Sequence, residues 1–178
     1  MSFSKRKTKL RQHFQIQCLQ DLQIWNRVYR IGEREMEYSK IMKERIHRCR
    51  ILFQELQCEV FEEEMYEDTF SAGFQHTSGF QGVFFIDRDS RFIEIAYSFS
   101  FSRSLTSFLS NQLTEILKIC YEYGCYTNIE TEEQEINLAV YTKIYFAGLN
   151  YYSLKETIRD FKDCVLFLKD ILSIRKEL

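Results

Sequence analysis

The chain has 178 residues, of which 45% are hydrophobic, 16% aromatic and 28% charged, and none is proline. This aromatic content excludes a disordered protein, because the chain can bury enough apolar surface to fold. The absence of proline excludes collagen-like and proline-rich classes. The formal charge of −2 hides an asymmetry: residues 1–50 carry 13 Lys and Arg against 5 acids, and residues 51–178 carry 11 against 21. The sequence therefore indicates a basic N-terminal part on an acidic body, which suits one domain with a long appendage.

The cysteines and the N-terminus indicate the compartment. None of the six cysteines has the C-x-x-C spacing of a zinc or redox site, so no metal is expected. The basic start is not followed by an apolar signal region, and no stretch approaches the ~18 apolar residues of a membrane span. We therefore expect a cytoplasmic protein with reduced, mostly buried thiols.

The first third of the chain has a helical pattern. Residues 5 to about 66 lack strand alternation, and Gly32 separates two apolar series with helical spacing. We expect two helices, or one helix kinked at Gly32, the first with a narrow stripe typical of a coiled-coil or partner contact. The predicted organisation is a basic helical extension over residues 1–44 and an α+β domain over residues 45–178. The first stripe comprises Leu10, Phe14, Cys18, Leu22, Trp25, and Val28 or Tyr29.

After residue 68 the pattern changes to short strands and capped helices. Ser102 or Ser104 can cap the first of these helices and Gly124 can end it, while Ser153 opens a capping box for the second. We expect an α+β fold with an antiparallel sheet in the order βββ-α-ββ-α. The predicted strands cover residues 69–76, 80–86, 91–101, 125–130 and 136–146, and the predicted helices cover 105–120 and 153 to nearly the C-terminus.

No motif for catalysis is present. The three histidines are not part of a nucleophile signature, and His76 is best interpreted as a surface residue at a hairpin end. The glycines fit no phosphate-binding loop. Asp87 and Asp89 resemble the start of a calcium loop but lack its glycine and final glutamate. We expect a protein that is not an enzyme and has no cofactor and no metal.

Two patterns indicate binding. The first is a basic arm with the density of Lys and Arg that neutralises phosphates, joined by Arg45, Arg48 and Arg50; its residues are Lys5, Arg6, Lys7, Lys9 and Arg11. The second is aromatic. If the alternating faces of the strands at 93–101 and 136–146 cover the helices, their other faces point outward and offer protein contacts. The candidate partner-binding residues are Phe92, Tyr141 and Tyr145 on the sheet and Trp25 in the first stripe. Alternatively, the N-terminal helices cover this face themselves.

The order of elements resembles a known family. A helix ending near Met65, the run from Gly82 to Tyr97, and the later segments 105–120, 136–146 and the helix capped at Ser153 are similar to the type III secretion chaperone-like fold, which bacterial YbjN-type proteins share. The resemblance covers about residues 45–175. It implies a small, cytosolic, often dimeric and non-catalytic protein that holds partner segments on hydrophobic patches. The basic stretch of about 45 residues departs from that pattern.

These observations lead to a first hypothesis and two rivals. The first is a cytosolic, non-enzymatic module that binds a partner protein as a chaperone or adaptor. The main rival is a nucleic-acid-associated regulatory protein that binds through the basic N-terminal arm, with possible contacts over residues 5–50. In the third, the N-terminal helices serve homo-oligomerisation, for example as a homodimer.

Overall fold

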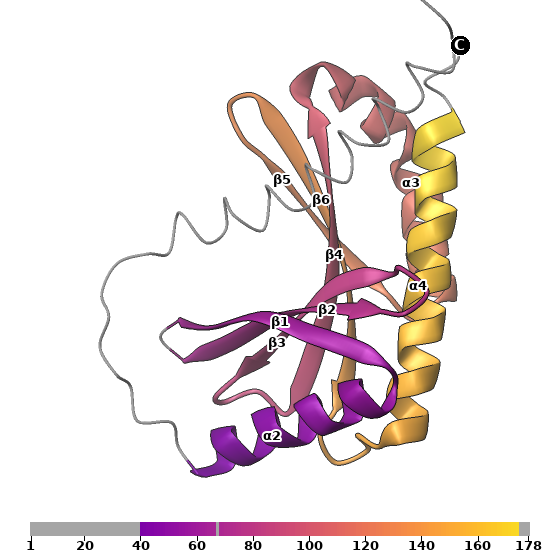
Figure 1. The fold of residues 1–178 in the computed structure, drawn as a ribbon. Coiled ribbons are helices and arrows are strands. Elements are labelled where there is room, and N and C mark those ends of the chain that lie inside the picture. Colours follow the sequence, from indigo (N-terminus) through magenta and orange to yellow (C-terminus); the bar gives the residue numbers. More distant parts are fainter. Residues whose placement is uncertain (1–39, 67, 175–178) are drawn as a thin grey trace, which may run out of the picture.

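The computed structural model describes residues 40–66 and 68–174 of the chain (Figure 1). It confirms an α+β fold, with three α-helices, one short 3-10 helix and six strands in the described residues. Helix α2 (Lys40–Glu55) precedes β1 (Cys58–Tyr66), β2 (Thr69–His76), β3 (Gln81–Asp87), β4 (Phe92–Ser102), η1 (Arg103–Leu105), α3 (Thr106–Glu122), β5 (Tyr126–Thr131), β6 (Glu135–Tyr145) and α4 (Tyr151–Ile174).

The six strands form one antiparallel sheet in the order β1-β2-β3-β4-β6-β5. Its central pair joins β4 to β6, and each of these strands has 11 residues. Their register runs without a shift from Phe92 opposite Tyr145 to Ser102 opposite Glu135. This uninterrupted pairing connects the four-stranded meander β1–β4 with the β5–β6 hairpin.

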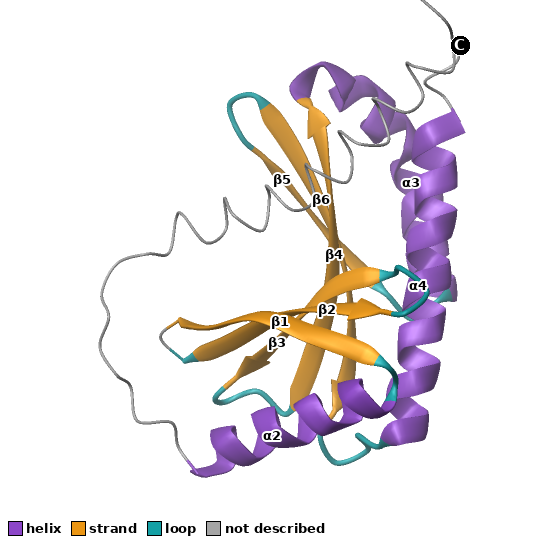
Figure 2. Ribbon diagram, in the orientation of Figure 1, coloured by secondary structure: helices purple, strands orange, loops and turns teal. Residues whose placement is uncertain are grey.

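The described helices all pack on the same face of the sheet (Figure 2). Strand β4 sends Ile93, Ile95, Phe99 and Phe101 into the core, and β6 contributes Ile136, Leu138 and Val140. Phe53 of α2 stacks on Phe84 at a centroid distance of 4.6 Å and lies 4.9 Å from the ring of Phe74. The buried aromatic residues therefore fill the space between the sheet and one layer of helices.

Helix α2 belongs to this core from its first turn. Met42 is buried, so the domain boundary expected at residue 45 falls inside a helix that packs on the sheet. The helical pattern predicted for residues 5–39 lies outside the described residues. No helix within residues 40–66 and 68–174 has the length and apolar character to cross a membrane.

Strand β1 was not predicted, because residues 58–66 were assigned to a helix that continued to about residue 66. The helix ends at Glu55, and Gln57 adopts a φ of 59° that reverses the chain. Residues 58–66 then pair with β2, with a bulge at Glu62, whose φ is 49°. Glutamate is a good helix former, but intrinsic helix propensity is a small energy, and pairing with β2 outweighs it. The observed order is ββββ-α-ββ-α.

The cap of α4 also differs from the prediction. The side chain of Asn150 accepts hydrogen bonds from the amides of Tyr152 and Ser153 at 2.9 and 3.0 Å. Ser153 instead accepts from the Asn150 amide at 2.9 Å, so the helix begins at Tyr151. Ser102 caps the short η1 rather than α3, which begins at Thr106 without a side-chain cap. Gly124, with a φ of 64°, follows α3 as predicted.

Gly82 is a packing constraint on the core. A Cβ at this position would lie 2.8 Å from the ring of Phe74 and 3.1 Å from the carbonyl oxygen of Ala96. Because Phe74 is fully buried, its ring has little room to move. We predict that Gly82→Ala lowers the free energy of unfolding by about 1–3 kcal/mol, measured by urea denaturation.

Gly148→Ala is the matched control. The nearest atom to its added Cβ is the carbonyl oxygen of Tyr145 at 3.9 Å, so a change within about 0.5 kcal/mol is expected. Equal effects of the two substitutions would contradict the packing constraint at Gly82.

Candidate functional site

The candidate site is the sheet face opposite the described helices, which we call the open face. The strand registers place one row of residues directly across all six strands of this face. The row begins with Phe61 on β1, whose ring lies over Gly73, and ends with Tyr126 on β5, whose ring stacks on Tyr141 at 5.3 Å. In order, the row consists of Phe61, Gly73, Val83, Ala96, Tyr141 and Tyr126.

More aromatic side chains continue this row toward one end of the sheet. Phe85 lies one row further along β3, and Phe92 and Tyr145 face each other across β4 and β6 with ring centroids 5.8 Å apart. Tyr145 is 53% exposed and Tyr126 is 39% exposed. These residues lie in three successive rows of the same face, and the middle row also holds Glu94 and Lys143. We call them the apolar patch, consisting of Phe61, Val83, Phe85, Phe92, Tyr126, Tyr141 and Tyr145.

One lysine lies among these rings. The ammonium nitrogen of Lys143 is 5.3 Å from the ring centre of Phe92, 5.9 Å from that of Tyr126 and 6.0 Å from that of Tyr145. At these distances the rings stabilise the cation through their negative faces. Lys143 therefore adds to the aromatic character of the patch.

Two tyrosine hydroxyls at the patch, those of Tyr126 and Tyr141, are neutral. The hydroxyl of Tyr126 donates to the carboxylate of Glu94 on β4. Burial, and secondly this hydrogen bond, raises the pKa of Tyr126; burial also raises the pKa of Tyr141, with Glu130 and Glu94 contributing. Both phenols therefore keep their protons at physiological pH. The patch is a platform of aromatic rings with neutral hydroxyls, which suits contact with apolar side chains.

The charged residues around the patch are mostly acidic. The open face carries Lys143 together with acidic side chains on five of its strands. The strand registers place on it Glu59, Glu64, Asp87, Glu94, Glu130 and Glu135. This distribution repels phosphate groups and attracts Lys and Arg side chains.

The structure brings together three of the four residues proposed from the sequence for partner binding. Phe92, Tyr141 and Tyr145 lie on the open face, whereas Trp25 and the basic arm of Lys5, Arg6, Lys7, Lys9 and Arg11 lie outside the described residues. Sequence reasoning missed Val83 and three further aromatic residues of the patch. The alternation along residues 83–87 is a signal that could have placed Phe85 on the open face. Phe61 fell in a predicted helix, and Tyr126 fell in a short predicted strand for which no face was predicted. The missed aromatic residues are Phe61, Phe85 and Tyr126.

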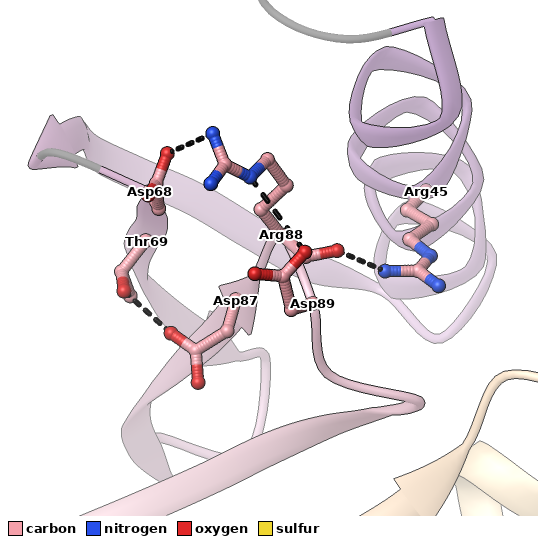
Figure 3. A network of polar contacts seen from close by, with 6 residues as sticks. All are labelled: Arg45, Asp68, Thr69, Asp87, Arg88 and Asp89. Carbon is pink, nitrogen blue, oxygen red and sulfur yellow. Dashed lines mark hydrogen bonds and ion pairs between the residues drawn. The ribbon is translucent and has the colours of Figure 1, made fainter.

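The arginines of α2 bind acceptors of their own chain. Arg45 donates to the carbonyl oxygen of Arg88 (Figure 3), Arg48 to the carbonyl oxygen of Leu149, and Arg50 to the carboxylate of Glu63. Arg45 also places its guanidinium 4.6 Å from the ring centre of Phe146. These contacts attach α2 to the β3–β4 turn, to the loop before α4 and to β1, and they occupy the guanidinium groups that the sequence suggested for phosphate binding.

The buried cysteines are not nucleophiles. The five described cysteines are free thiols and all are buried. Burial raises the pKa of Cys49 to about 12 and that of Cys58 to about 11. A hydrogen bond with Cys164 and burial together raise the pKa of Cys120. The thiols of Cys49, Cys58 and Cys120 are therefore protonated at physiological pH, which lowers their reactivity.

We predict that Arg48→Ala destabilises the fold. Arg48 donates to the carbonyl oxygens of Phe146 and Leu149, and truncation leaves both without this donor. The expected loss is about 1–3 kcal/mol in the free energy of unfolding, measured in urea. Lys43→Ala, at an exposed position of the same helix, is the control and should stay within about 0.5 kcal/mol. A stability loss no larger than that of the control would show that these hydrogen bonds do not hold α2.

We also predict that the described thiols resist alkylation in the folded protein. In a Cys18→Ser full-length chain, iodoacetamide at about pH 8 should label none of the five cysteines until the protein is unfolded in urea. Mass spectrometry of the native and unfolded samples measures the labelling. Rapid modification of Cys49 or Cys58 in the native state would contradict the protonated, buried assignment.

Comparison with known proteins gives a likeness at the level of the fold. No protein-family model matches the chain. No curated protein matches it either. Among solved structures, the fold is similar to YbjN from E. coli, described as "a putative transcription regulator", with a TM-score of 0.54, 14% identity, and coverage of 70% of this chain and 89% of the other.

An uncharacterized protein from Methanothermobacter thermautotrophicus is similar in the same way, with a TM-score of 0.51, 14% identity, and coverage of 70% and 96%. At such identity, the two comparisons establish a similar fold and leave the function to be argued from the residues. The chain has a YbjN-like α+β fold.

Proposed function

We propose that the protein is a non-catalytic protein-binding module, with a chaperone or adaptor role, and that it binds its partner on the open face. The observation that carries this proposal is the apolar patch. It faces away from every described helix and combines Val83 with six aromatic residues: Phe61, Phe85, Phe92, Tyr126, Tyr141 and Tyr145. Aromatic residues contribute most to binding when a partner desolvates them.

The charges beside the patch support a protein partner over a nucleic acid. Stacking of bases on aromatic rings needs basic residues nearby to hold the phosphates, whereas the open face carries Glu94, Asp87 and other carboxylates around a single lysine. A polypeptide segment with apolar side chains and flanking Lys or Arg fits both the patch and its acidic surroundings. This is the partner chemistry that the proposal implies.

The chaperone or adaptor role is also part of the proposal. The order of elements resembles that of secretion chaperones, which hold partner segments along hydrophobic patches. YbjN, whose fold is similar, is described as "a putative transcription regulator". A cytoplasmic location and a homodimeric state remain expectations from the sequence. The similar fold supports the proposal only through the surface that this chain itself presents.

The proposal is tested by removing aromatic rings from the open face. The double variant Phe92→Ala/Tyr145→Ala should lose the protein that co-purifies with the wild type, and its affinity for that purified partner should fall at least about tenfold. Isothermal titration calorimetry measures the affinity. The substituted residues are half-buried or exposed, so urea denaturation should show a folded variant.

The matched control is Tyr121→Ala/Tyr152→Ala, which removes two aromatic rings that are 87% and 76% exposed on the helices. It should bind the partner as the wild type does. Equal capture by both double variants would refute the proposed surface. Capture of nucleic acid instead, with an affinity that falls steeply as salt rises, would favour the rival function.

A further inference from the structure

The apolar patch has no cover among the described residues, while 39 residues of the chain precede the first of them. Contiguous aromatic surface of this kind is uncommon on a protein without something that binds it. The segment before Lys40 is thus the first occupant to consider, because it is attached to the same molecule at a high effective concentration.

The charge of that segment is opposite to the charge of the open face. Residues 5–30 contain one acid, Asp21, and seven basic residues: Lys5, Arg6, Lys7, Lys9, Arg11, Arg27 and Arg30. The open face carries Glu59, Glu64 and Glu94 among its carboxylates, with Lys143 in the aromatic patch. Docking of the segment would bring its basic side chains close to these carboxylates. This attraction favours contact of the segment with the open face over contact with other surfaces of the domain.

The apolar pattern of the segment also matches the surface. Its residues recur at helical spacing from Leu10 to Tyr29, and Trp25 lies among them. A helix of these twenty residues is about 30 Å long. Six strands at a spacing of about 4.8 Å span roughly 24 Å. One helix would therefore cross the whole sheet and contact the aromatic row from β1 to β5.

The point where the described chain begins makes this route short. Arg45, in the second turn of α2, donates to the carbonyl oxygen of Arg88 at 3.0 Å. Arg88 in turn forms an ion pair with Asp68 at 2.6 Å, so the second turn of α2 is joined to the β3–β4 turn, which is itself joined to the β1–β2 turn (Figure 3). Phe92, at the end of the apolar patch, follows the β3–β4 turn. The ten residues 30–39 extend to at most about 33–36 Å, enough to pass round this end of the sheet.

We infer that residues 10–29 dock on the open face of their own chain when no partner is bound, and that a partner must displace them. This inference rests on the proposed function, because it concerns the same surface. The segment acts as an intramolecular competitor: its basic, amphipathic character copies the partner chemistry for which the open face is suited. Partner binding is then coupled to release of the basic arm.

Trp25 provides the measurement, because it is the only tryptophan in the chain. In the full-length protein, docking should shift its fluorescence to shorter wavelength and protect it from acrylamide quenching. Tyr145→Lys places a positive charge on the open face and should expose Trp25, whereas Tyr152→Lys on α4 should leave it protected. The inference is overturned if Trp25 is quenched equally in the wild type, in Tyr145→Lys and in denaturant.

A substitution within the segment gives a second readout that does not alter the described domain. Leu22→Glu places a carboxylate in the apolar stripe and should increase the quenching of Trp25 as Tyr145→Lys does. Protection in the wild type should be independent of protein concentration over about a hundredfold range. Protection that increases with concentration would identify a second copy as the occupant and overturn the intramolecular inference.

Partner affinity separates this inference from the proposed function. If the segment covers the face in nine of ten molecules, the apparent affinity for a partner is reduced about tenfold, and Leu22→Glu should restore it. Loss of partner binding in Phe92→Ala/Tyr145→Ala with Trp25 exposed in every variant would refute the inference and keep the function. A different result would refute the proposed function and leave the docking intact: Trp25 is protected from quenching, Tyr145→Lys exposes it, and the protein binds no partner.

Discussion

The pairing of β4 with β6 sets which side chains reach each face of the sheet. These two strands are the longest in the sheet, and their residues stay in register over their whole length. A slip by one residue would send every side chain of β6 to the opposite face. Leu138 and Val140 would then leave the core, and Tyr141 and Tyr145 would enter it. The same register therefore determines both the core and the open face.

Coverage of one sheet face gives the two faces different physical roles. On the covered face, rings such as Phe53, Phe74 and Phe84 pack against one another and exclude water. On the open face, aromatic residues pack beside each other along the sheet, and Tyr126 directs its hydroxyl to Glu94. Side chains in the first group contribute to stability, whereas those in the second retain exposed surface for another molecule. This exposed surface is the one to which we assign both the proposed partner and the proposed docking of the basic segment.

The sequence errors have local physical causes. Residues 58–66 contain glutamates that favour a helix, yet β1 forms because a strand there pairs with β2, and the bulge at Glu62 accommodates the extra residue. The cap of α4 shifted from Ser153 to Asn150 because both side chains can bond the first amides, and the loop geometry selects one. Periodicity predicts which face of an element is apolar, but competing local bonds determine where the element starts.

Local patterns of residues were enough to predict the α+β class, the alternation of β4 and β6 and the outward direction of Phe92, Tyr141 and Tyr145, because a period of two is a property of the strand alone. The row that joins Phe61 and Tyr126, from opposite edges of the sheet, with Tyr141 became visible only from the strand pairing. The tertiary structure also decided that the arginines of α2 bind their own chain. Such contacts depend on strand order and on distances between elements far apart in the chain, which no local pattern of residues encodes.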